Sequence, residues 1–141
     1  MNKDVNRLKN ALNEQNKNEA EVKFELTDET KTVDGTTVFR IRALRDVNNP
    51  QRKIREGDLG GFVEKEANLS QEGECWVEGE AVAMNNAFVE ENAKVMKEAI
   101  VKSSAKITGQ AIVSDISVIT SKSVVKDEAL VKGDCLLEKG S

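Results

Sequence analysis

The sequence predicts a mainly β protein: a single-stranded parallel β-helix of about four coils, preceded by a β-hairpin and an N-terminal helix. From Cys75 onward, a small residue is followed two positions later by an apolar residue, eleven times at a spacing of six. A period of six is a multiple of the two-residue period of a strand and has no helical counterpart. The small and apolar residues therefore share the inner face of an extended chain, and the residue between them points outward.

Three series define this repeat. The inward small residues are Cys75, Ala81, Ala87, Ala93, Ala99, Ala105, Ala111, Ser117, Ser123, Ala129 and Cys135. The inward apolar residues are Val77, Ala83, Val89, Val95, Val101, Ile107, Val113, Ile119, Val125, Val131 and Leu137. The bend positions, rich in residues that tolerate turns, are Gly79, Asn85, Glu91, Lys97, Ser103, Gly109, Asp115, Ser121, Asp127, Gly133 and Lys139.

With three hexads in each coil, residues eighteen apart stack, and the outward residues form three columns. Two of the columns contain a lysine: Trp76, Lys94, Ile112, Leu130 and Phe88, Lys106, Val124. The third column is apolar throughout, with Met84 beside it. An apolar ladder of this length favours self-association, with a dimer as the simplest form. The interface would comprise Val82, Met84, Ile100, Val118 and Leu136. The alternative is that the N-terminal helix covers this column through Leu8 and Leu12.

These hexads resemble the left-handed parallel β-helix of hexapeptide-repeat proteins, in which a small residue follows an aliphatic one by four positions, as Ala81 follows Val77. The stretches 57–63 (GDLGGFV) and 69–77 (LSQEGECWV) more specifically resemble uncharacterised acetyltransferase-like proteins of enterobacteria, phages and prophages. The resemblance covers roughly residues 22 to 141. In the acyltransferases a bend residue commonly follows the aliphatic residue directly. Here it comes one position later, so the spacing leaves the handedness open.

The chain divides into three segments. Residues 1–20 have Val5, Leu8, Ala11 and Leu12 at helical spacing, which predicts a weakly amphipathic helix or else a solvated tail. Residues 21–56 predict a β-hairpin that turns at Asp34-Gly35, then a loop containing the chain's single proline, Pro50. Residues 57–141 form the solenoid, and we expect the hairpin to cap its open end. We expect Gly60-Gly61 to provide the turn into the first coil.

Basic residues concentrate between residues 40 and 55, whereas residues 67–141 carry 12 acidic and 8 basic residues. Residues 40 and 42 share one face of a strand, and the loop after them brings further basic side chains nearby. This cluster is a candidate site for an acidic protein or another anion. Its members are Arg40, Arg42, Arg45, Arg52, Lys53 and Arg55. The alternative is a solvated surface or ion pairing to the acidic solenoid.

The composition indicates a small cytoplasmic protein, and the resemblance implies that the cell is a bacterium or a phage-infected host. The 141 residues carry a net charge of −4, with no apolar run long enough to span a bilayer and no motif that reads nucleic acid. We therefore expect no membrane association, and nucleic-acid binding is disfavoured. Cys75 and Cys135 occupy inward positions about three coils apart, at about 4.8 Å per coil, which is too far for a disulfide.

No catalytic machinery can be assembled from the sequence. Hexapeptide acyltransferases commonly use histidine as a general base, and this chain contains no histidine. Carboxylates such as Glu78, Glu90 and Asp115 fall at exposed positions, and neither a metal cluster nor a cofactor motif is present. We expect a non-catalytic solenoid that acts by binding a protein, with inhibition of a host defence system as a specific role suggested by the phage-borne relatives. The alternative is a degenerate or unusual acyltransferase that binds acyl-CoA between subunits.

Overall fold

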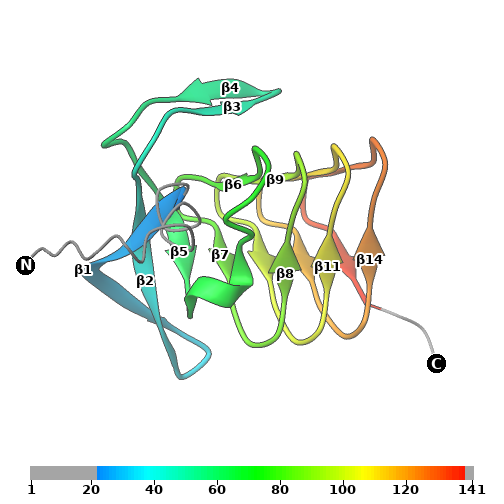
Figure 1. The fold of residues 1–141 in the computed structure, drawn as a ribbon. Coiled ribbons are helices and arrows are strands. Elements are labelled where there is room, and N and C mark those ends of the chain that lie inside the picture. Colours follow the sequence, from blue (N-terminus) through cyan, green and yellow to red (C-terminus); the bar gives the residue numbers. More distant parts are fainter. Residues whose placement is uncertain (1–21, 139–141) are drawn as a thin grey trace, which may run out of the picture.

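A computed structural model describes residues 22–138. It shows a parallel β-solenoid of about four turns, preceded by antiparallel strands at its N-terminal end (Figure 1). This confirms the predicted fold class. The helix predicted for residues 1–20 lies outside the described residues.

The coils are built from two-residue strands that alternate with turns. These strands are β6 (Trp76–Val77), β7 (Val82–Ala83), β8 (Phe88–Val89), β9 (Lys94–Val95), β10 (Ile100–Val101), β11 (Lys106–Ile107), β12 (Ile112–Val113), β13 (Val118–Ile119), β14 (Val124–Val125), β15 (Leu130–Val131) and β16 (Leu136–Leu137). They form three faces. Face A contains β7, β10, β13 and β16, face C contains β8, β11 and β14, and face D contains β6, β9, β12 and β15.

Successive coils pair in register eighteen residues apart, as predicted. Ile100 pairs with both Val82 and Val118 in parallel. The N–H of each outward residue donates to the carbonyl of an inward small residue in the next coil: Val82 to Ala99 at 2.9 Å and Val118 to Cys135 at 2.7 Å. In each coil the N–H groups of the outward residues therefore point toward the C-terminal end of the solenoid.

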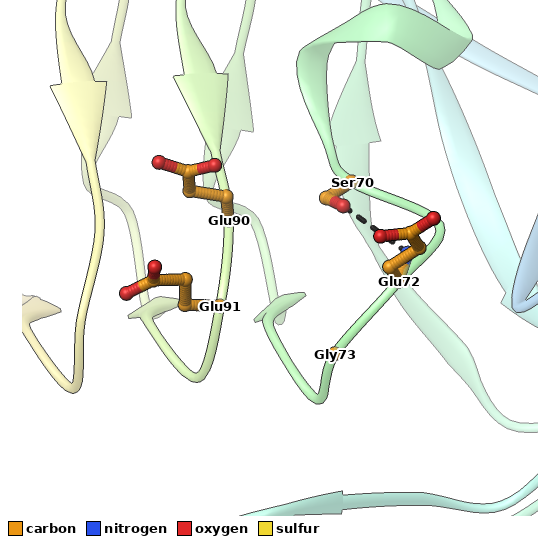
Figure 2. Close-up of a pocket in the computed structure, with 5 residues that line it drawn as sticks. All are labelled: Ser70, Glu72, Gly73, Glu90 and Glu91. Atoms are coloured by element: carbon orange, nitrogen blue, oxygen red, sulfur yellow. Dashed lines mark hydrogen bonds between the residues drawn. The ribbon is translucent and has the colours of Figure 1, made fainter.

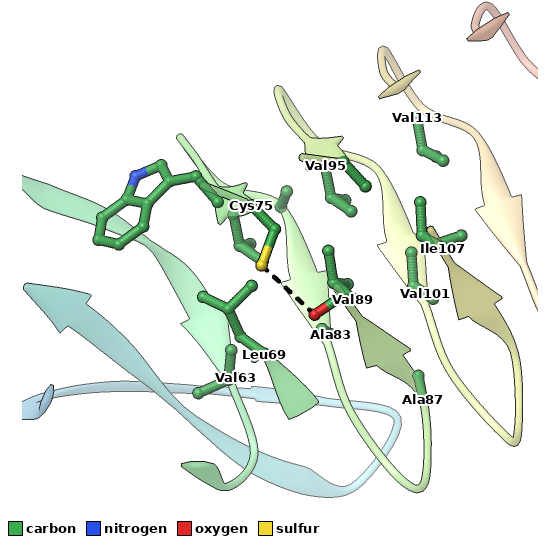
Figure 3. Packing of buried hydrophobic residues seen from close by; sticks show 14 of the residues in the cluster. Val63, Leu69, Cys75, Ala83, Ala87, Val89, Val95, Val101, Ile107 and Val113 are labelled. Atoms are coloured by element: carbon green, nitrogen blue, oxygen red, sulfur yellow. Dashed lines mark hydrogen bonds between the residues drawn. The ribbon is translucent and has the colours of Figure 1, made fainter. Parts of the chain in front are cut away.

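The inward series fills the interior (Figure 3). Every inward residue from Cys75 to Ile119 is at most 2% exposed. Small side chains stacked beside aliphatic ones keep the cross-section of the solenoid narrow. A narrow solenoid of this kind still buries a continuous core. In the last coil this burial ends: Val131 and Cys135 are half-buried, and Ala129 is exposed.

Each predicted bend position from Gly79 to Gly133 has a positive φ between 60° and 79°. This left-handed conformation costs an L-residue about 1–2 kcal/mol. Side chains stabilise the stacked corners in return. Asn85 accepts a hydrogen bond from the Ser103 N–H at 3.0 Å, and Asp115 accepts one from the Gly133 N–H at 2.8 Å.

The predicted hairpin is also confirmed. Strands β1 (Phe24–Val33) and β2 (Thr36–Ala43) are antiparallel around Asp34-Gly35, whose φ values of 50° and 78° suit a two-residue turn. Strand β2 pairs antiparallel with β5 (Leu59–Val63), which in turn pairs parallel with β7. The hairpin thus extends face A beyond the first coil.

Gly60 and Gly61 lie within β5, so the expectation that they form a turn is wrong. A Cβ at Gly60 would lie 2.6 Å from the carbonyl oxygen of Val77, and one at Gly61 would lie 2.7 Å from that of Ala81. These glycines let β5 approach the first coil closely.

The segment expected to be a loop contains a second hairpin. Strands β3 (Val47–Asn49) and β4 (Arg52–Ile54) pair antiparallel on either side of Pro50-Gln51. Three-residue strands are too short to show alternation, and only Val47 and Ile54 supply apolar side chains to the core. A short 3-10 helix, η1 (Glu66–Asn68), precedes the first complete coil.

Candidate interaction surfaces

The basic cluster is engaged within the fold, and Arg40 is its most buried member. Its guanidinium pairs with Glu29 at 3.0 Å and with Glu80 at 3.1 Å, and it donates to the Gly60 carbonyl at 2.7 Å. It also lies 4.4 Å from the centre of the Phe62 ring. The hairpin is therefore tied to the solenoid through this side chain.

Most other members of the cluster also have acidic partners. Two of these partners lie in the solenoid segment: Glu74 for Arg45 at 3.5 Å and Glu78 for Arg52 at 3.2 Å. The remaining pairs are local, Arg42 with Glu25 and Lys53 with Asp46. Within residues 22–138 the structure gives Arg55 no ion pair. The six side chains do not form a common patch of unpaired positive charge.

The pKa values of the partner carboxyls reflect this pairing. Hydrogen bonds from Arg40 and then Lys31 lower the pKa of Glu80 below its ordinary value of 4.5. At Glu78, burial raises the pKa, but the hydrogen bond and charge of Lys94, joined by Arg52, outweigh it, so the pKa is lowered. Both carboxylates are therefore charged at neutral pH.

Lys94, the lysine in the outward column of face D, is buried rather than solvated. Trp76 is 0% exposed and Lys94 is 1% exposed. The Lys94 ammonium lies 2.8 Å from Glu78, which satisfies its charge inside the fold. The second hairpin packs nearby, and the Asn49 amide donates to the Glu74 carbonyl at 2.9 Å.

The apolar column on face A is covered at one end and open at the other. Val82 and Met84, predicted to be outward interface residues, are 0% and 1% exposed, in a buried cluster with Val38 of β2 and Phe62 of β5. The prediction of an exposed patch is wrong for these two residues, because the hairpin and β5 supply their contacts. Along the rest of the column, Ile100 and Val118 are half-buried, and Leu136 is 62% exposed.

An acidic edge runs along the corner between faces C and D. We define the acidic edge as Glu72, Glu90, Glu91, Asp127 and Glu128. Figure 2 shows its first part, a shallow hollow lined by Glu72, Glu90 and Glu91 together with Ser70 and Gly73. A second hollow farther along includes Asp127 and Glu128. Sequence reasoning located the negative charge in the solenoid but not its position on one corner, which requires the coil phase to be combined with the charge pattern.

Of the acidic edge, one carboxylate has an ion pair among the described residues: Glu90, with Lys106 at 3.2 Å. Glu91 accepts a hydrogen bond from the Gly109 N–H at 2.9 Å. The carboxylates of Glu72, Asp127 and Glu128 lie on exposed residues. The edge therefore has a net negative charge at neutral pH.

Sequence reasoning missed a buried lysine beside the first cysteine. The Lys23 ammonium lies 3.2 Å from the Cys75 sulfur and 2.8 Å from the Cys75 carbonyl oxygen, and both residues are 0% exposed. Burial lowers the pKa of Lys23 and raises that of the Cys75 thiol. The pair is enclosed, which suits packing rather than chemistry with a solute. Both cysteines are free, as expected.

The described part of the chain contains no group of three or more acidic, cysteine or histidine side chains placed to hold a metal ion. In residues 22–138, no helix has the length and apolar character needed to cross a bilayer. Comparison with protein-family models gives no match, and comparison with curated proteins gives none either. The resemblance to hexapeptide-repeat proteins therefore rests on the residues quoted above and on the solenoid fold.

Proposed function

We propose that this protein is a non-catalytic binding protein that presents its solenoid to a protein partner, with the acidic edge contacting a basic surface. The supporting observation is that five carboxylates gather at one corner of the solenoid, in the first coils and again in the last. They project from hydrogen-bonded coils, which repeat at about 4.8 Å. A backbone that already fixes where the charges start needs little ordering when a partner binds, so more of the interaction energy is retained.

The internal pairing of the basic cluster supports a structural role for it. Arg40, Arg45 and Arg52 already contact Glu80, Glu74 and Glu78. A partner that recruited these side chains would first have to break those pairs. The negative edge also repels phosphate groups, which disfavours nucleic acid as the partner. Inhibition of a bacterial defence protein remains the specific role suggested by the phage-like resemblance.

The proposal is tested by neutralising the edge. A variant carrying Glu72→Gln, Glu91→Gln, Asp127→Asn and Glu128→Gln removes four charges and preserves side-chain size. The matched control removes four exposed charges elsewhere, through Asp28→Asn, Glu56→Gln, Glu66→Gln and Glu98→Gln. Affinity capture from bacterial lysate should retain a defined protein on the wild type and the control but lose it on the edge variant. Equal retention on all three would contradict the proposal.

Acetyl-CoA distinguishes the acyltransferase alternative. Glu78 and Asp115 have lowered pKa values, for Asp115 through the Gly133 N–H and then Lys97, whereas a carboxylate base needs a raised one. Isothermal titration should therefore detect no binding of acetyl-CoA to the full chain. Saturable binding would favour the alternative.

A further inference from the structure

The last described coil, residues 122–138, differs from the coils before it in that its lysines have no ion pair among the described residues. Lys94, Lys97, Lys102 and Lys106 in earlier coils all form ion pairs. None of the charged residues in the last coil forms one with another described residue, and all of them are exposed. They are Lys122, Lys126, Asp127, Glu128, Lys132, Asp134 and Glu138.

The same coil has an apolar edge that no other described residue covers. Its outward residues Val124, Leu130 and Leu136 are 54%, 55% and 62% exposed. In earlier coils the N–H of such a residue donates to the next coil, as Ile112 does to Ala129 at 2.9 Å. The N–H groups of these three residues have no acceptor within residues 22–138. In a parallel ladder the N–H and C=O of one residue face the same neighbour, so their carbonyls point outward as well.

We propose that this apolar edge of the last coil binds the same apolar edge of a second copy. The two last coils are then antiparallel about a two-fold axis through Leu130. Leu130 then faces Leu130 of the other copy, and Val124 faces Leu136. Each facing pair has an N–H and a C=O on both sides, as the hydrogen-bonded pairs of an antiparallel ladder require. This inference goes beyond the proposed function and uses a different set of residues, except for Asp127 and Glu128 at the coil's corner.

Charge complementarity selects this register. Residues whose numbers sum to 260 face one another, which opposes Lys122 to Glu138, Lys126 to Asp134, and Glu128 to Lys132. Every one of these pairs is of opposite sign, and each occurs twice by symmetry. Moving the axis to residue 129 would oppose Lys126 to Lys132. Moving it to residue 131 would oppose Glu128 to Asp134.

The inward residues are complementary in the same register. A small residue faces a larger apolar one in each pair: Ser123 with Leu137, Cys135 with Val125, and Ala129 with Val131. The half-buried core of the last coil would therefore continue into the second copy. A two-fold axis perpendicular to the solenoid also matches the rise of the coil. Strand β14, at the start of the last coil, then faces β16, at its end.

The test uses two complementary charge variants of the full chain. Lys122→Glu with Lys126→Glu places glutamates opposite Glu138 and Asp134, and Asp134→Lys with Glu138→Lys places lysines opposite Lys126 and Lys122. Sedimentation equilibrium should find wild type dimeric and each variant with a dissociation constant raised at least about tenfold, because facing like charges repel. An equimolar mixture of the two variants should form a heterodimer, since all four altered contacts are then attractive.

Lys65→Glu is the matched control, because Lys65 is an exposed lysine near η1 at the opposite end of the solenoid. It should leave the dimer unchanged, and circular dichroism should show every variant folded. A monomeric wild type would overturn the proposal. A wild-type dimer that tolerates both variants, or variants that stay monomeric when mixed, would overturn it as well.

The position of the axis is tested by disulfide cross-linking in a Cys135→Ser background. Serine fits this position, because the same inward stack already contains Ser117 one coil earlier. Leu130→Cys should form a disulfide between residue 130 of one copy and residue 130 of the other. Facing Cα atoms of a hydrogen-bonded pair are about 5.5 Å apart, which suits a disulfide. Val124→Cys should cross-link only when mixed with Leu136→Cys. Self-cross-linking of Val124→Cys without cross-linking of Leu130→Cys would contradict the register.

Discussion

The two ends of the solenoid place the same repeat position in opposite environments. At the N-terminal end, Phe62, Trp76 and Val82 are outward residues that are at most 2% exposed. At the C-terminal end, Val124, Leu130 and Leu136 hold the equivalent position and are more than half exposed. The difference arises from the non-repeating segments, since hairpins β1–β2 and β3–β4 pack only on the first coils. The hexad specifies the interior, and the covering segments decide what becomes of the outer face.

The largest effect is expected from the fully buried interior of the middle coils. Val113→Asp buries a carboxylate between coils with no cation to pair with it, which should unfold the protein. Ile116→Asp places the same side chain at a corner position that is 51% exposed, and should change the melting temperature little. Thermal denaturation followed by circular dichroism compares them. A wild-type melting temperature for Val113→Asp would show that the register is wrong.

The next largest difference in stability is expected between a covered and a less covered part of the outer face. Phe62 is buried, with the cations of Lys31 and Arg40 at 4.3 and 4.4 Å from its ring centre, whereas Phe88 is half-buried on face C. Phe62→Ala should lower the free energy of unfolding by about 3–5 kcal/mol, and Phe88→Ala by clearly less. Urea denaturation measures both. Equal losses would mean that the hairpin contributes no more packing than solvent-facing neighbours do.

Acid should weaken the attachment of the hairpin to the solenoid. The pKa of Glu80 is lowered in the folded state, so its contribution to stability is present above its ordinary value of 4.5 and is lost as pH falls through the lower folded value. Glu80→Gln should therefore flatten the pH dependence of the melting temperature in that range. Glu98→Gln, at an exposed carboxylate without an ion pair among the described residues, serves as the control. An unchanged slope for Glu80→Gln would contradict the assignment.

The smallest effect is expected at a corner. Lys97 has φ of 60°, a conformation that glycine adopts without steric cost. Lys97→Gly should stabilise the fold by up to about 1 kcal/mol, since relief of strain exceeds the added entropy of the unfolded chain. Glu98→Gly, at the next position with ordinary φ, should destabilise it. Chemical denaturation resolves the sign, and destabilisation by Lys97→Gly would show that its ion pair with Asp115 matters more than backbone strain.

The sequence predicts the interior and the corners because both follow from local periodicity. Counting in sixes places Val95 in the interior and Lys97 at a corner, as the structure has them. The β3–β4 cover is not predictable in this way, since its strands are too short to have a period, whereas the β1–β2 hairpin shows alternation. Ion pairs such as Arg52 with Glu78 join residues 26 positions apart, so the sequence left open whether the basic cluster is a free surface or is paired to the solenoid, and only the fold shows the pairing. Lys23 likewise occurs in a plain strand pattern, and only the fold places it against Cys75.

A sequence that repeats every six residues risks folding out of frame, because many shifted alignments place small and aliphatic residues inside. Gly60 and Gly61 remove this ambiguity at the first step. Strand β5 lies this close to the first coil because two successive residues lack a Cβ, which would come within 2.6 Å of the Val77 carbonyl oxygen and 2.7 Å of that of Ala81. We expect folding to begin where the β1–β2 hairpin, built from local contacts, presents this glycine pair to the first coil. Each later coil then copies the frame of the one before it.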